Sequence, residues 1–154
     1  MTTASKSRPT HVRQGTVGAA RLVADGVQRW LAVAAVALCA LQIAFAGSGF
    51  WATATGGEAA GRAAFEPHAI NGEVLQWIAV ALLVGGIIAR ANKKAWIIPL
   101  VVAVLLWGVQ GLLVGLGFGV STFFGALHAF DGTVITAGFV WLAYDRWQHR
   151  LTSP

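Results

Sequence analysis

The chain has 154 residues, of which 56% are hydrophobic and only 11% are charged, and its mean hydropathy is +0.67. A water-soluble domain carries roughly 25% charged residues, so this chain has too few to cover a surface in contact with water. The formal net charge is +5, but the basic residues stand at the ends of apolar segments, where they act as a topology signal. The composition therefore predicts an all-α integral membrane protein in a lipid bilayer and gives no reason to expect nucleic acid as a partner.

Four apolar stretches are long enough to cross a bilayer, which takes about 20 residues of helix. They predict an up-down bundle of four helices, flanked by a basic cytoplasmic tail at 1–28, expected to be disordered, and by a second cytoplasmic tail at 148–154. The sequence AFA at 44–46 resembles a signal-peptide cleavage site, but an uncleaved anchor is the favoured interpretation. Within the transmembrane domain, 29–147, the expected spans are Trp30–Phe50, Pro67–Arg90, Ala95–Phe118 and Thr122–Leu142.

The distribution of basic residues predicts the direction of these spans. Cytoplasmic loops of membrane proteins are enriched in lysine and arginine. Only Arg62 falls on the side of the loops that follow spans one and three. Both termini are therefore predicted to be cytoplasmic, in a bacterial plasma membrane. The basic residues on the cytoplasmic side are Lys6, Arg8, Arg13, Arg21, Arg29, Arg90, Lys93, Lys94, Arg146 and Arg150.

Polar residues recur in matching places and indicate an internal repeat. Gln42 and Gln110 each begin the pattern Q-x4-G-x-G-F near the end of an outward-going span. After a loop, the phrase H-A-x-[N/D]-G-x-V follows at 68–74 and again at 128–134. The chain therefore resembles two tandem helical hairpins of the same direction, with a longer loop in the first.

The repeated histidines, His68 and His128, are the candidate ligands. They lie at the same depth near the outer boundary, on helices that sit diagonally in an up-down bundle. Because neighbouring helix axes are about 8–10 Å apart, the diagonal is roughly 14 Å, which leaves room for one flat metalloporphyrin between two imidazoles. We therefore expect His68 and His128 to bind a b-type haem for electron transfer, with a redox partner or a larger membrane complex beside it.

Neighbouring residues of the same phrase suit such a site. Gly72 and Gly132 lie one helical turn after each histidine and are expected to leave space for the ring system. Asn71 and Asp131 are expected to order the second ring nitrogen of each histidine or a water molecule outside it. Together with the histidines, these residues form the predicted cofactor site.

A second interpretation stays open. The phrase H-x-x-x-G is also typical of a packing seam of small residues with a histidine at the membrane boundary, in which Gln42 and Gln110 hydrogen-bond neighbouring helices. The chain would then be a non-enzymatic membrane protein or an accessory subunit of a larger complex. Glu73, a carboxylate within a span, faces either the bundle interior or the outer headgroups. No nucleophile with its base, phosphate loop or zinc-hydrolase helix is present, so no catalytic residue is predicted.

Two hairpins, each with one histidine at the outer end of its second helix, resemble half of a haem A synthase and other bis-histidine membrane b-type cytochromes. In residues the resemblance covers only His68 and His128. The glutamate motif of the synthases is not reproduced, since Glu66 precedes His68 by two positions and nothing similar precedes His128. The resemblance therefore implies haem binding rather than synthase chemistry. The chain also resembles small four-span membrane proteins of high-GC Gram-positive bacteria, which implies no particular activity.

Overall fold

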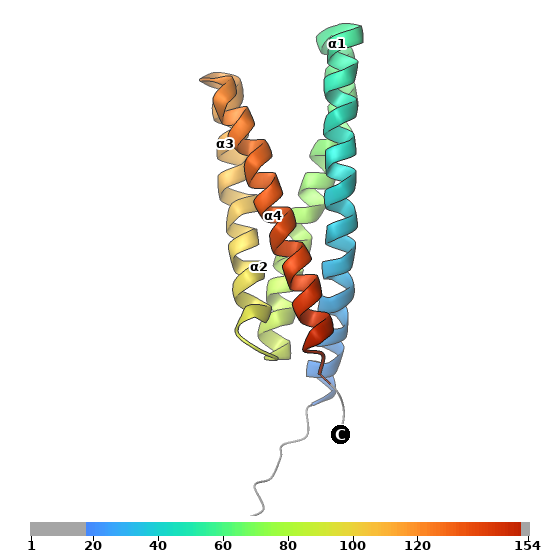
Figure 1. The fold of residues 1–154 in the computed structure, drawn as a ribbon, viewed down its shortest axis with the longest axis vertical. Helices are drawn as coiled ribbons and strands as arrows, with labels where there is room; N and C mark the ends of the chain where they lie inside the picture. Colours follow the sequence, from blue (N-terminus) through green and yellow to red (C-terminus); the bar gives the residue numbers. More distant parts are fainter. Residues whose placement is uncertain (1–17, 152–154) are drawn as a thin grey trace, which may run out of the picture.

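The computed structural model describes residues 18–151, and all regular structure in this range is helical, which confirms the all-α prediction. Helix α2 continues through a single π-helical segment, η1, into α3 without a break, so that the three form one rod of 26 residues. The helices stand roughly side by side along one direction (Figure 1). In chain order the elements are α1 (Ala19–Ala89), α2 (Lys94–Val104), η1 (Leu105–Val109), α3 (Gln110–Gly119) and α4 (Thr122–Gln148).

Helix α1, with 71 residues, is folded back on itself at Gly57. This glycine has φ 80° and ψ −174°, a backbone conformation that side-chain-bearing residues rarely adopt. The segments before and after it, 19–56 and 58–89, are here called arm 1 and arm 2. Arm 2 returns along arm 1, as Figure 1 shows, and the Gln28 amide donates to the Leu82 carbonyl at 2.8 Å between them.

Four separate spans were predicted, whereas the structure has three helices that are long and apolar enough to cross a membrane. The first two expected spans belong to the single helix α1. The predicted outer loop between the first two spans is helical on both sides of Gly57. Its sequence, WATATGGEAAGRAAFE, is rich in alanine, the strongest helix former, so the longer connection of the first repeat extends both arms.

The start of α1 corrects the predicted N-terminal boundary. The helix begins at Ala19, so the last ten residues of the expected disordered tail, 19–28, are helical. Asp25 and Gln28 in this segment are buried, at 1% and 0% exposure, and both bind other helices. These tertiary contacts hold the segment in the bundle, although it precedes the apolar stretch of the first expected span. The rest of that tail, 1–17, and residues 152–154 lie outside the described residues.

Contacts between elements set the order of the helices around the bundle. Arm 1 packs on arm 2 and on α4, where Trp30 and Trp147 meet with ring centroids 5.5 Å apart. Arm 2 packs on the α2–η1–α3 rod, where the Gln76 amide donates to the Leu106 carbonyl at 3.1 Å. The rod packs in turn on α4. Arm 2 and α4 are therefore diagonal to each other, as the sequence predicted for the two histidine-bearing segments.

The core is narrow and built around small side chains. Ala32, Ala35 and Ala79 are fully buried, and Cys39 is 4% exposed, so the helices approach closely along the middle of the bundle. Burial also follows the internal repeat: the sequence of buried, half-buried and exposed positions over 71–79 is the same over 131–139. The outside of the bundle is apolar and exposes large side chains throughout its length, including Ile43, Trp51 and Phe118.

Candidate bis-histidine site

The structure brings the two repeated histidines together from diagonal segments. His68 on arm 2 and His128 on α4 are both half-buried, and their ring centroids lie 6.3 Å apart with an angle of 58° between the planes. The rings of Phe65 and His68 meet edge to face, with their centroids 6.0 Å apart. The predicted convergence of the two side chains is therefore a feature of the described fold.

Each histidine is held by the glutamine of its own repeat. The Gln42 side-chain amide donates to the His68 carbonyl at 3.0 Å, and the Gln110 amide donates to the His128 carbonyl at 3.1 Å. The Nδ1 atom of His68 lies 3.1 Å from the Gln42 carbonyl oxygen. A carbonyl only accepts hydrogen bonds, so this contact requires a proton on Nδ1, and in the neutral ring the free lone pair is then on Nε2.

The second histidine differs from the first at the same atom. Nδ1 of His128 is buried and forms no close hydrogen bond among residues 18–151, although the Gln110 backbone carbonyl lies near this ring, as the Gln42 carbonyl does near His68. The His128 ring is therefore held less closely by its glutamine than the His68 ring is.

Asn71 and Asp131 are buried, at 7% and 8% exposure, but they do not contact the ring nitrogens as predicted. The Asn71 amide donates to the side-chain oxygen of Gln42 and to the Leu38 carbonyl. In the second repeat the Asp131 carboxylate accepts from the Gln110 amide at 2.9 Å. The carbonyl of Gln42, one helix away, holds the His68 nitrogen instead, and the Asn and Asp side chains orient the glutamines.

The glycines of the repeated phrase do not face a neighbouring backbone. A Cβ added at Gly72 would meet only the Gln42 amide nitrogen, at 3.5 Å, and one at Gly132 only the Gln110 amide nitrogen, at 3.9 Å. Both are ordinary van der Waals distances. A close-packed seam is found elsewhere, at Gly86, where a Cβ would collide with the Ala95 carbonyl. The two repeated glycines are therefore not points of close contact between helix backbones.

The donor set of the site is limited to two imidazoles. Within the described range, no group of three or more histidine, cysteine, aspartate or glutamate side chains is placed to hold a metal ion. Glu73 is exposed on the outside of arm 2 and does not contribute to the bundle interior. Two nitrogens fall short of the four ligands of a structural zinc site, so a metal held here needs the remainder from a macrocycle or solvent.

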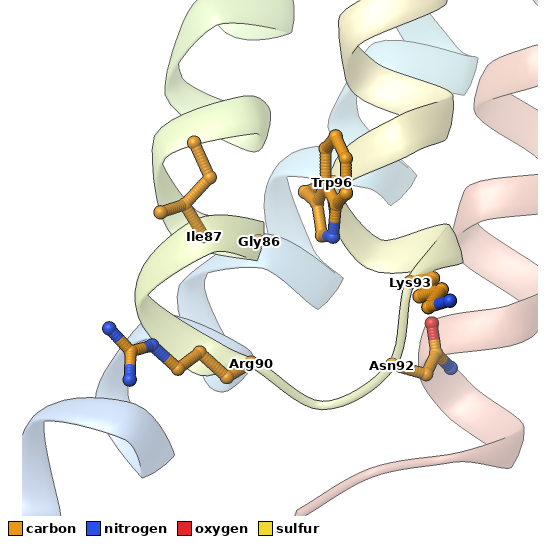
Figure 2. Close-up of a pocket in the computed structure, with 6 residues that line it drawn as sticks. All are labelled: Gly86, Ile87, Arg90, Asn92, Lys93 and Trp96. Atoms are coloured by element: carbon orange, nitrogen blue, oxygen red, sulfur yellow. The ribbon is translucent and has the colours of Figure 1, made fainter.

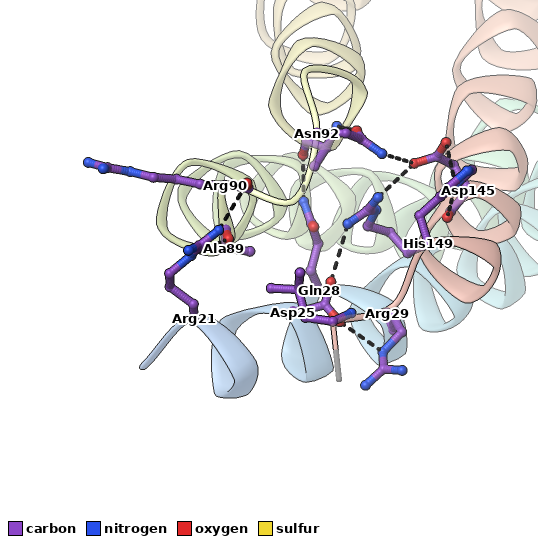
Figure 3. A network of polar contacts seen from close by, with 12 residues as sticks. Arg21, Asp25, Gln28, Arg29, Ala89, Arg90, Asn92, Asp145 and His149 are labelled. Atoms are coloured by element: carbon purple, nitrogen blue, oxygen red, sulfur yellow. Dashed lines mark hydrogen bonds and ion pairs between the residues drawn. The ribbon is translucent and has the colours of Figure 1, made fainter. Parts of the chain in front are cut away.

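A second polar cluster lies at the end of the bundle where α1 begins and α4 ends. This end of the bundle is here called the base. The sequence did not predict the cluster. The Arg146 side chain is fully buried and contacts Asp25 at 3.2 Å and Asp145 at 2.8 Å (Figure 3). The Asn92 amide donates to Asp145 at 3.1 Å. His149 is 63% exposed and lies against Asp145, and His11 lies outside the described residues.

One feature of the sequence points to this cluster. Asp25 and Asp145 are the only acidic residues on the side of the chain predicted to be cytoplasmic. An isolated acid among many basic residues is a candidate partner for one of them.

Comparison of the chain with protein-family models, with curated proteins and with solved structures gives no match.

Proposed function

We propose that this chain is a multi-pass protein of the bacterial plasma membrane, with both termini cytoplasmic, and that His68 and His128 bind a b-type haem near the outer face. The observation that carries the proposal is the convergence of the two repeated imidazoles from diagonal segments, with centroids 6.3 Å apart. In this proposal arm 1, arm 2, the α2–η1–α3 rod and α4 each cross the bilayer once.

The apolar outside and the charged base support the membrane part of the proposal. Soluble monomers rarely expose contiguous apolar surface over more than a few hundred Å², whereas this bundle exposes large aliphatic and aromatic side chains on all its helices. The described basic residues near the base include Arg21, Arg90 and Lys93. Their concentration at one end supports a cytoplasmic position of the base under the positive-inside rule.

The separation of the two rings suits two imidazoles that share one metal. With metal–nitrogen bonds of about 2 Å, two imidazoles bound on opposite sides of one metal have ring centroids roughly 6 Å apart. The observed separation of 6.3 Å fits this arrangement. The Gln42 carbonyl fixes the His68 tautomer in the form that offers Nε2, which is the role that neighbouring carbonyls take for metal-binding histidines. Gly72 and Gly132 leave room beside the rings.

A haem held by two histidines supplies one-electron transfer. The protein residues would supply the position and the environment: His68 and His128 as the ligands, Gln42 and Gln110 as the groups that hold them. The narrow apolar core between the site and the base would keep water away from it. Electron exchange would then take place with a redox partner or a larger membrane complex at the outer face.

One observation favours the alternative, a non-enzymatic membrane protein or accessory subunit in which the histidines are structural. The Gln42–His68–Asn71 set closes its hydrogen bonds within the protein, as a polar connection between helices in a membrane does. The His128 set repeats these contacts except for a close hydrogen bond to Nδ1. The haem proposal therefore rests on the approach of the two rings rather than on the hydrogen bonds of either one.

Absorption spectroscopy tests the proposal. Protein purified from haem-replete cells is expected to show a Soret band and, after reduction, the split bands of a low-spin b-type spectrum. His68→Ala or His128→Ala should abolish this spectrum or convert it to a high-spin form, because one ligand position is then open. His149→Ala is the matched control and should leave the spectrum unchanged. A wild-type protein that stays colourless after addition of haemin would refute the proposal in favour of the structural role.

A further inference from the structure

At the base of the bundle, a surface pocket lies between the end of arm 2 and the start of α2. It has a volume of about 560 Å³ and is lined by Gly86, Ile87, Arg90, Asn92, Lys93 and Trp96 (Figure 2). We propose that this pocket binds one anionic phospholipid of the cytoplasmic leaflet, with its phosphate between Arg90 and Lys93 and the start of an acyl chain along Ile87 and Trp96. The proposal rests on the proposed membrane crossing, but not on haem binding.

The cations of the pocket are free to bind a headgroup. Arg90 and Lys93 are both exposed, and neither forms an ion pair with any carboxylate in 18–151. Figure 2 shows them on the two sides of the turn that joins the helices, with the Arg90 guanidinium extending away from Lys93, so this exposed side chain would turn toward a headgroup bound between them. Two cations at one site give an anionic headgroup an advantage over a zwitterionic one, whose own positive charge they repel.

The remaining polar group of the lining is already occupied. The Asn92 side chain donates to Asp145 at 3.1 Å and accepts from the Ala95 backbone amide at 2.9 Å. These bonds hold the turn in place and occupy both polar atoms of the asparagine side chain, so it is not expected to bind the headgroup. The positive charge of Arg90 and Lys93 is therefore the main polar feature that the pocket offers.

The wall of the pocket suits a lipid rather than a free anion. Ile87 is 51% exposed and Trp96 is 37% exposed, on facing helices. In Figure 2 the indole nitrogen of Trp96 lies on the side of the ring toward the turn, where a headgroup would be, and its carbon edge points away from the turn. This orientation is typical of tryptophan at a membrane interface. A soluble phosphate would use the cations but gain nothing from this apolar wall.

Gly86 gives the pocket its depth. It is buried where arm 2 meets α2, and a Cβ there would collide with the Ala95 carbonyl, so the two helices touch at this point and diverge outside it. The pocket is the space left on the outside of this contact.

Lipid retention in mixed detergent micelles tests the proposal. Protein incubated with equal amounts of phosphatidylglycerol and phosphatidylcholine is analysed by native mass spectrometry, which counts the lipids bound to each molecule. The wild type is expected to retain one phosphatidylglycerol in preference to phosphatidylcholine. The double variant Arg90→Gln/Lys93→Gln should lose this preference, with retention roughly thirtyfold weaker.

The matched control is Lys94→Gln/Arg150→Gln, which removes the same charge from the same end of the protein but does not change the pocket lining. It should retain phosphatidylglycerol like the wild type. Equal loss in both double variants would mean diffuse attraction to a basic surface and would refute a specific site. Trp96→Ala, which keeps every charge, should also weaken retention, and unchanged retention in this variant would refute the lipid pose. Far-UV circular dichroism confirms in each case that the bundle is folded.

Discussion

The replacement Arg146→Met tests the role of the ion-pair cluster at the base. Arg146 is fully buried, and its partners Asp25 and Asp145 are 1% and 3% exposed, so methionine would fill much of the volume but leave Asp145 buried without this cation and Asp25 with only Arg29, at 3.6 Å. Removing one partner from a buried pair typically costs about 3–5 kcal/mol, because the remaining charge stays desolvated and unpaired. We expect a loss of free energy of unfolding toward the lower end of this range, because Asp25 keeps Arg29 and Asp145 keeps the hydrogen bond from Asn92.

Titration of the detergent-solubilised protein with sodium dodecyl sulfate, followed by far-UV circular dichroism, measures this loss. Arg62→Met is the matched control: Arg62 contacts Glu58 at 3.9 Å, but both side chains are more than 80% exposed, so little stability should be lost. The triple variant Asp25→Asn/Asp145→Asn/Arg146→Met removes the stranded charges and should recover part of the stability. If Arg146→Met is no less stable than Arg62→Met, the cluster does not hold the base together.

Two further predictions concern topology and the glycines. In a Cys39→Ser background, a cysteine in place of Arg62 should react with a membrane-impermeant thiol reagent added outside intact cells, and one in place of Lys93 should not; the opposite pattern would reverse the orientation. Gly132→Leu should lower haem content while largely preserving the melting temperature, because the new side chain meets only a glutamine side chain, whereas Gly86→Leu should unfold earlier because it meets a helix backbone. Equal destabilisation by both would identify Gly132 as a packing residue.

The sequence alone predicted the helical class and the convergence of His68 and His128, because both follow from strong patterns. Long apolar stretches determine the helices, and a phrase repeated at equal depth on diagonal segments brings its histidines to the same place. The partners of these histidines were predicted less well. A hydrogen bond between neighbouring helices depends on their relative shift along the axis, and this shift is not determined by either helix sequence by itself. The sequence therefore did not predict that the Gln42 carbonyl holds the ring nitrogen of His68, and this role was assigned to Asn71 instead.

The fold of α1 illustrates a second limit of sequence reasoning. Hydropathy marks where a helix enters apolar surroundings, but not where the helix itself ends. Arm 1 therefore begins earlier and continues further than its apolar stretch, because the flanking residues form helix and contact other helices. Asp25 is the clearest case, since a carboxylate in a basic segment reads as a surface residue until the position of Arg146 is known.

The two repeats differ most where the base is built. By the alignment of the histidine phrases, Gly85 and Gly86 of arm 2 correspond to Asp145 and Arg146 of α4. An arginine has no room at Gly86, which touches the α2 backbone, so only the second repeat carries a buried cation at this depth. The ion-pair layer therefore occurs once, whereas the glutamine and histidine layer at the other end occurs in both repeats. Because the duplicated side chains approach from opposite sides, the proposed ligand between them has to offer the same coordination chemistry on both faces. In the proposal, His68 and His128 would be the equivalent ligands of such a group, and haem would supply one-electron transfer there.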